Sequence, residues 1–277
     1  MSIDNGDFYA TGAHRAAIIP LDKAGRPVFT TTSATTPFAG TDFRGLHTWD
    51  IPGIKMNQIT HMDNDAPVVT QQLPPKEMPV ATLTTGVKSM DIVALLSDVK
   101  KVAIGNGFSV DYITDKMGFN PPVALFLKRW AVDNDSRIEA WEWAIVRSTK
   151  INPNTNKWDA VAQENSFEVA LNKGKTRLYG TVLTEAVDGC LESAYQNGEF
   201  EGEPVMLFWN ADGTEDEFLF KDEAGNVITA SATTAITVWD YDSGAKLTTG
   251  LTKSVTKLNF TYPPANGHLI VAMLEKA

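Results

Sequence analysis

The side chains that could carry out chemistry are few in this sequence and lie far apart along it. Histidine occurs at four positions, and no two of them have the spacing of a metal-binding pair: His14, His47, His61 and His268. A zinc or iron site needs three or four ligands, so folding alone would have to assemble one. Surface or strand-face histidines are the simpler interpretation, and the sequence predicts no metal site and no cofactor.

Cys190 is the only cysteine, so no disulfide can form within the chain. Its neighbours Asp188 and Glu192 are acidic, and negative charge disfavours the thiolate that makes a cysteine reactive. The sequence also lacks the glycine-rich phosphate loops and the nucleophile elbow that mark common enzyme classes. We therefore interpret Cys190 as a small core or surface residue.

Carboxylates are plentiful, and a pair of the kind that hydrolyses glycosides stays open from sequence alone. The clusters, however, occur in turn-like segments at Asp63/Asp65, Asp133/Asp135 and 215–217. Solvated turns explain such clusters without any chemistry. Together with the missing motifs, this predicts a protein that is not an enzyme.

The charge of the chain argues against tight nucleic-acid binding. Its 34 acidic and 24 basic residues give a net charge of −10, whereas phosphate binding needs lysine and arginine gathered on one face. The only basic doublets are Lys100-Lys101 and Lys128-Arg129. DNA could pass such a surface without being held.

No apolar run reaches the ~20 residues that span a bilayer, and the acidic N-terminus is unlike a secretion signal, so we expect a cytoplasmic location and no membrane partner.

Trp141 and Trp143 are two residues apart in a run with strand character, so they share one side of that strand. Exposed, the pair could stack on sugar rings. Buried, it would fill a sheet core or a subunit interface. We favour the core or interface interpretation.

Alternating apolar and polar residues indicate β-strands along most of the chain. Turn residues at 22–27 separate the first two strands, and glycine, acid and proline between 198 and 204 mark a boundary. We therefore expect a mainly β protein with two domains, residues 1–202 and residues 203–277. Both are expected to be β-sandwiches, the second one small and built of short strands with regular turns.

One α-helix is expected to flank the first sandwich, from Met90 to Val99. Ser89 can cap its first turn, and Asp91 complements the helix dipole there. Apolar residues then recur from Ile92 with the i, i+3, i+4, i+7 spacing of a buried helix face.

The segment from His61 to Glu77 is long, polar and proline-bearing, and we interpret it as an arm that reaches another subunit. We expect a loop over about residues 61–79, with its prolines holding the return stretch extended. The residues expected to make the contact are Asp63, Asn64, Asp65, Gln71, Gln72, Leu73, Pro74 and Pro75.

Several segments, taken in order, resemble the major tail tube proteins of long-tailed bacteriophages with non-contractile tails. They are Phe43–Leu46, Ile59–His61, Gln72–Glu77, Val123–Leu127, Trp141–Ile145, Leu178–Thr181 and Leu183–Gly189. Their order and spacing carry the resemblance, since none is diagnostic alone. The segments Thr237–Asp240, Leu247–Thr252 and Leu258–Thr261 resemble an Ig-like β module often appended to phage structural proteins.

The resemblance implies a tail tube β-sandwich with a flanking helix, carrying the small module as decoration outside the tube. Six subunits would form a ring, closing the edge strands of each. Rings would stack head to tail into a filament, with the arm crossing to the next ring. An acidic lumen would conduct duplex DNA. The implied partners are the protein itself and other tail proteins (tape measure, terminator and baseplate), assembled in the host cytoplasm and kept in the virion tail.

Two other classes stay open. A tail terminator, baseplate ring or decoration protein would share the same sandwich-and-arm organisation without indefinite stacking. A carbohydrate-binding or hydrolytic β protein would use Trp141, Trp143 and a carboxylate pair.

Overall fold

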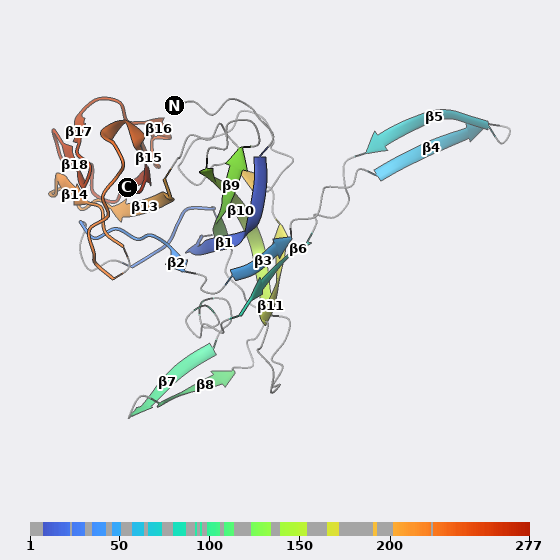
Figure 1. Cartoon of the computed structure of the whole chain (residues 1–277), viewed down its shortest axis with the longest axis horizontal. Coiled ribbons are helices and arrows are strands. Elements are labelled where there is room, and N and C mark those ends of the chain that lie inside the picture. Colours follow the sequence, from blue (N-terminus) through green and yellow to red (C-terminus); the bar gives the residue numbers. More distant parts are fainter. Residues whose placement is uncertain are drawn as a thin grey trace.

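The computed structural model of the chain is mainly β, with several antiparallel sheets (Figure 1). The structure describes residues 8–22, 24–30, 35–42, 46–50, 57–63, 66–73, 80–86, 92, 95, 99–105, 108–113, 123–133, 139–153, 165–171, 191–192, 202–222 and 224–277. Within these residues, no helix is long and apolar enough to cross a bilayer.

The largest sheet is built from the first part of the chain and follows the order β2-β1-β9-β10-β11-β6-β3, with β12 paired to β10. Its strands are β1 (Phe8–Pro20), β2 (Thr41–Asp42), β3 (Leu46–Asp50), β6 (Val80–Thr85), β9 (Val123–Asp133), β10 (Glu139–Pro153), β11 (Asn165–Leu171) and β12 (Leu191–Glu192). The sheet curls, because β3 at one end of this order comes within 8 Å of β1, measured between Cα atoms. We call it the main sheet.

The register of β1 and β9 divides their residues between two faces of the main sheet. Ile19 lies opposite Ala124, and Ala17 lies opposite Phe126; cross-strand partners share a face. Both faces are apolar, because the alternate residues of these strands, such as Leu125, are buried as well. A strand covered on both faces reads as a nearly continuous apolar run, as 123–127 does.

Residues 204–275 form a sandwich of two sheets, which we call the C-terminal sandwich. One sheet has the order β13-β19-β15-β16, and the other has the order β14-β18-β17. The strands are β13 (Pro204–Asn210), β14 (Glu217–Leu219), β15 (Ile236–Asp240), β16 (Ala245–Lys246), β17 (Leu251–Lys253), β18 (Lys257–Phe260) and β19 (Leu269–Glu275). Between the sheets lies a core in which Trp209 packs edge-on against Phe218, with ring centroids 5.8 Å apart.

The central strand β19 is buried on both of its faces. Ile270, Ala272 and Leu274 enter the core of the C-terminal sandwich, whereas Val271 and Met273 point the other way, into a second core. The period-two alternation of a strand produces this division, and β13 repeats it. The sheet β13-β19-β15-β16 is therefore a middle layer between two cores.

The second core joins the C-terminal sandwich to the main sheet, and we call it the junction core. Its buried members are Ile19, Leu21, Ala124, Phe126, Met206, Phe208, Leu269, Val271 and Met273. A backbone bridge crosses the same contact: Phe38 and Phe208 each donate an N–H to the carbonyl of the other, at 2.8 and 2.9 Å. The C-terminal sandwich and the main sheet therefore share one hydrophobic core.

Two turns, 200 residues apart, have the same sequence pattern and the same hydrogen bonds. The Asp22 amide donates to the Arg26 carbonyl, and the Asp222 amide donates to the Asn226 carbonyl, each at 2.9 Å. In each turn an aspartate Oδ1 accepts the amide four residues on, at 2.8 Å. Gly25 and Gly225 take φ values of 85° and 84°, which glycine adopts without a steric cost. The turn predicted at 22–27 is confirmed.

The predicted helix from Met90 to Val99 is not confirmed. Ile92 and Leu95 are helical, and Ile92 is buried, but the residues around them lie outside the described part of the chain. Val99 begins a β-strand, so the predicted C-terminal end is wrong. Among the elements with assigned bounds, the one helical element is a 3-10 turn, Thr233–Ala235.

Candidate functional site

The expected arm is a β-hairpin, and not a loop, wherever the structure describes it. β4 (Asn57–Asp63) and β5 (Ala66–Leu73) pair antiparallel, and Asn57 lies opposite Leu73. Figure 1 shows the pair extending well away from the main sheet. The prediction of a loop over residues 61–79 is therefore wrong for residues 61–63, which lie in β4, and for β5, because alternating residues on both sides of a two-residue connection favour strand pairing.

The structure places the expected contact residues in different parts of this hairpin. Asp63 ends β4, and Gln71, Gln72 and Leu73 end β5. Midway along the hairpin, Thr60 of β4 lies opposite Thr70 of β5. The remaining expected residues, Asn64, Asp65, Pro74 and Pro75, lie outside the described residues.

A second hairpin leaves the main sheet, and it was not predicted. β7 (Val99–Gly105) pairs antiparallel with β8 (Phe108–Ile113), and Val99 lies opposite Ile113 (Figure 1). Asn106-Gly107 between them is the strongest short hairpin signal in a sequence. The helix expected up to Val99 conflicts with this signal, because Val99 is the first residue of β7.

Both hairpins form separate two-stranded sheets; in the described part of the chain, their strands hydrogen-bond only to each other. A two-stranded hairpin is marginally stable in water at best, and a third strand or a packing surface is needed to hold it. Its outer edges also carry backbone groups that can pair with another chain. Two such hairpins on one chain are thus suited to contact with other molecules.

Trp141 and Trp143 lie in β10, in the half of that strand that pairs with β9. Trp141 lies opposite Trp130, and Trp143 lies opposite Lys128. By this register, position 143 is on the face of the main sheet that bears Phe126 of the junction core. The structure describes the backbone positions of Trp141 and Trp143 but not their side chains.

The turn at 22–27 is tied to the C-terminal sandwich by polar contacts of Arg26. Its guanidinium pairs with the Asp242 carboxylate and donates from Nη2 to the Gly267 carbonyl at 2.8 Å. The Tyr241 hydroxyl donates to the Gly25 carbonyl at 3.2 Å, and Arg26 lies 5.8 Å from the Tyr241 ring centroid. These contacts form a polar rim around the junction core.

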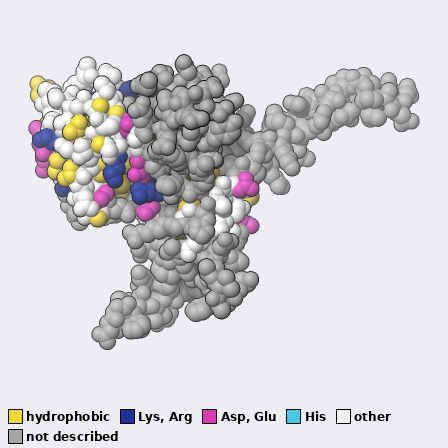
Figure 2. Space-filling view, in the orientation of Figure 1, with side chains coloured by type: hydrophobic (Ala, Val, Ile, Leu, Met, Phe, Trp, Pro, Cys, Tyr) yellow, Lys and Arg dark blue, Asp and Glu magenta, His cyan; other side chains and the backbone are white. Residues whose placement is uncertain are grey.

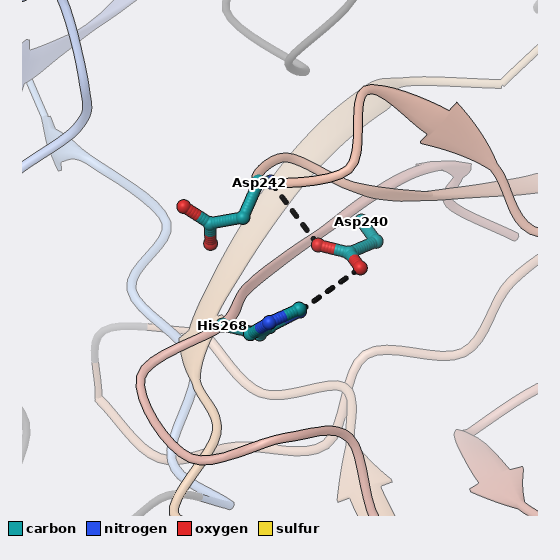
Figure 3. A group of neighbouring side chains, drawn as sticks. All are labelled: Asp240, Asp242 and His268. Carbon is teal, nitrogen blue, oxygen red and sulfur yellow. Dashed lines mark hydrogen bonds and ion pairs between the residues drawn. The ribbon is translucent and has the colours of Figure 1, made fainter.

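Asp240, Asp242 and His268 could each offer one metal ligand, since these atoms lie within 4.8 Å of one another (Figure 3). Each already has a partner in the protein. His268 Nδ1 lies 3.0 Å from Asp240 Oδ2, and Asp242 accepts the Leu269 amide at 2.7 Å in addition to Arg26. The arrangement is that of a hydrogen-bonded turn, and sequence reasoning considered His268 only as an isolated histidine.

A buried ion pair lies at the opposite side of the junction core from Arg26. Lys128 Nζ and Arg15 Nη1 both donate to Glu203 Oε1, each at 2.8 Å. The Lys128 side chain is only 10% exposed. Desolvation lowers the pKa of Lys128. Burial opposes the charged form of Glu203 as well, but the charge of Lys128 and its hydrogen bond outweigh it, so the pKa of Glu203 is lowered.

This ion pair gives a structural role to Lys128, one of the two adjacent basic residues at 128 and 129. In this basic doublet, Lys128-Arg129, it is Lys128 that pairs with Glu203 at the junction. Arginine and lysine on β1 and β9 meet a glutamate that precedes β13, so three separate stretches of chain define the site.

We expect the substitution Glu203→Gln to lower the free energy of unfolding at neutral pH by about 3 kcal/mol, because it leaves Lys128 buried without a counter-charge. A carboxyl with a lowered folded pKa stabilises the fold above its unfolded pKa, and this contribution is lost as the pH falls through the folded value. The wild type should therefore lose stability below about pH 4.5, and Glu203→Gln should lose less there. Urea unfolding from pH 3 to pH 8 measures both profiles.

Glu215→Gln is the matched control, since Glu215 is exposed and its loss should change the free energy by less than about 0.5 kcal/mol. The double variant Lys128→Met with Glu203→Gln should recover part of the stability, because it leaves no unpaired charge in the buried site. Identical pH profiles for the wild type and Glu203→Gln would contradict the assignment.

The comparisons with known proteins identify no relative. No protein-family model matches the chain, and neither the curated proteins nor the solved structures contain a match.

Proposed function

We propose that this chain is a structural subunit of a phage tail tube. The observation that carries the proposal is the pair of hairpins, β4–β5 and β7–β8, each of which hydrogen-bonds to no other described strand. A monomer gives such hairpins little support, whereas a neighbouring subunit can pair with their edges and cover them. The kind of assembly that we propose, a tail tube, is taken from the resemblance of the sequence to tail tube proteins.

In this proposal six subunits form a ring, and rings stack head to tail through a contact that does not close on itself. The main sheet supplies the ring contacts, and at least one hairpin crosses to a neighbouring subunit. The net charge of −10 per subunit disfavours tight binding of DNA phosphates, so duplex DNA would pass through the lumen without being retained. The tape measure, terminator and baseplate proteins would be its partners in a tail assembled in the host cytoplasm.

The proposed function predicts that the purified protein assembles into rings or tubes at high concentration. Edge strands and hairpins that a monomer leaves unpaired would then be satisfied between subunits. Negative-stain electron microscopy across concentration and ionic strength checks this, with sedimentation velocity giving the size of the smallest closed species.

Stacked tubes support the tail tube subunit, and closed rings that never stack would instead favour a terminator, baseplate or decoration protein. Compact monomers under all conditions would contradict the proposal. Binding to a glycan array that is lost on Trp143→Ala would favour the carbohydrate-binding class.

A further inference from the structure

A cavity of about 350 Å³ lies at the junction between the main sheet and the C-terminal sandwich. This volume is typical of a small-molecule pocket and far exceeds the ~30 Å³ of one water molecule. Much of its wall is built from the smallest residues, Ala16, Ala17, Ala39, Gly40 and Ala224. Larger side chains here would close the space, as they do in the adjoining junction core.

Six charged side chains line the cavity, three of each sign. They are Arg15, Lys128, Lys276, Asp42, Glu203 and Asp222. Figure 2 shows basic and acidic side chains close together along the margin of the C-terminal sandwich, where it meets the first part of the chain. A set with both signs can hold a charged ligand only if the basic or the acidic side chains have hydrogen-bonding groups that the protein itself does not use.

The acidic side chains already have donors from the protein. Glu203 Oε1 accepts from both Arg15 and Lys128. Asp222 accepts the backbone amide of Asn226 at 2.8 Å and its side-chain amide at 3.0 Å, and Asp42 has a partner as well. The carboxylates are thus occupied with holding the junction and its turn.

The basic side chains retain donors. An ammonium has three N–H groups and a guanidinium has five, and Lys128 and Arg15 each give one to the same Glu203 oxygen. The six charged side chains balance in number, so the spare hydrogen-bond donors of the cations, and not a net charge, would attract an anion. The Lys128 side chain is only 10% exposed, and a buried N–H group is costly when it has no acceptor.

We propose that the junction cavity binds a small oxyanion, a molecule carrying a phosphate or carboxylate group, between Lys128, Arg15 and Lys276. Charge-assisted hydrogen bonds from these groups would fix the anion, and Arg15 can donate two parallel bonds to one oxyanion. The apolar wall next to them accommodates a small body attached to the charged group. Both sides of the junction contribute cations, so the bound anion would link the main sheet to the C-terminal sandwich.

Calorimetric titration of the full chain with inorganic phosphate and, separately, with citrate tests the site at constant ionic strength set by sodium chloride. We expect saturable binding of one anion per chain. The double variant Arg15→Ala with Lys276→Ala should raise the dissociation constant at least tenfold. The Arg15 side chain is 56% exposed and Lys276 is exposed, so the variant is expected to remain folded.

Lys246→Ala is the matched control, because Lys246 is exposed on β16 and its loss should leave binding unchanged. Phosphate binding without citrate binding would assign the site to phosphate groups, and the reverse would assign it to carboxylates. Equal affinity in the wild type and the double variant, or no saturable binding of either anion, would overturn the proposal. Should the double variant unfold, Lys276→Ala alone carries the test. None of these outcomes depends on whether the protein forms tubes.

Discussion

A chain that ends at residue 202 is expected to lose its fold, and not only its last domain. The truncation removes Met206, Phe208 and their neighbours from the junction core and leaves Ile19, Leu21 and Phe126 facing water. Exposing these three side chains costs roughly 5–9 kcal/mol at about 1.5–3 kcal/mol each. This is comparable with the whole stability of a typical domain, about 5–15 kcal/mol.

Circular dichroism and gel filtration of the truncated chain check this expectation, with aggregation or lost strand signal as the expected result. Phe208→Ala is the milder test. Phe208 is fully buried, so this change should lower the free energy of unfolding by about 3–5 kcal/mol. Tyr262→Ala, at an 81% exposed position, should change it by less than about 0.5 kcal/mol. A soluble truncated chain with an unchanged melting temperature would show that the junction core is not needed.

For the proposed tail tube, we expect that removing the first hairpin leaves the fold intact and abolishes the stacking of rings. Asn57 and Leu73 are paired, so residues 58–72 can be replaced by Asn-Gly, a two-residue turn that joins adjacent strands. A cut of residues 63–71 alone would leave most of β4 without its partner strand. Electron microscopy of the variant should show rings or single subunits in place of tubes.

The second hairpin provides the matched comparison for this deletion. Val99 and Ile113 are paired in the same way, so replacing residues 100–112 by Asn-Gly makes an equivalent cut elsewhere on the chain. If only the first hairpin crosses between rings, this variant should still form tubes. Tubes of normal length from the variant without residues 58–72 would refute the role of β4–β5, provided that its melting temperature matches the wild type.

The strands with strong local signals were the most predictable part of the fold. The short run Val80–Thr85 forms β6, and the apolar run from Leu269 to Leu274 forms all but the last residue of β19. β7 and β8 were missed, since a helical apolar spacing ahead of them was extended to Val99. In that stretch the choice between helix and strand depends on tertiary contacts that the local pattern does not contain.

The junction core could not be derived from local patterns, because it joins residues that are distant in the sequence. Ile19 and Phe126 meet Phe208 and Val271 in one cluster. One signal was present in β19: its run from Leu269 to Leu274 is apolar without alternation, which is typical of a strand covered on both faces. The Lys128–Glu203 pair had no comparable signal, since it depends on how the two parts dock.

The middle-layer position of β19 has a consequence for how the protein is made. The apolar face of β1 and β9 is covered by strands that are synthesised much later, so the junction core rests on contacts of long sequence separation. Such contacts form slowly, since a long loop must close before they contribute. During synthesis that face stays uncovered until β19 has emerged. We therefore expect the junction core to form only after β19 has been synthesised.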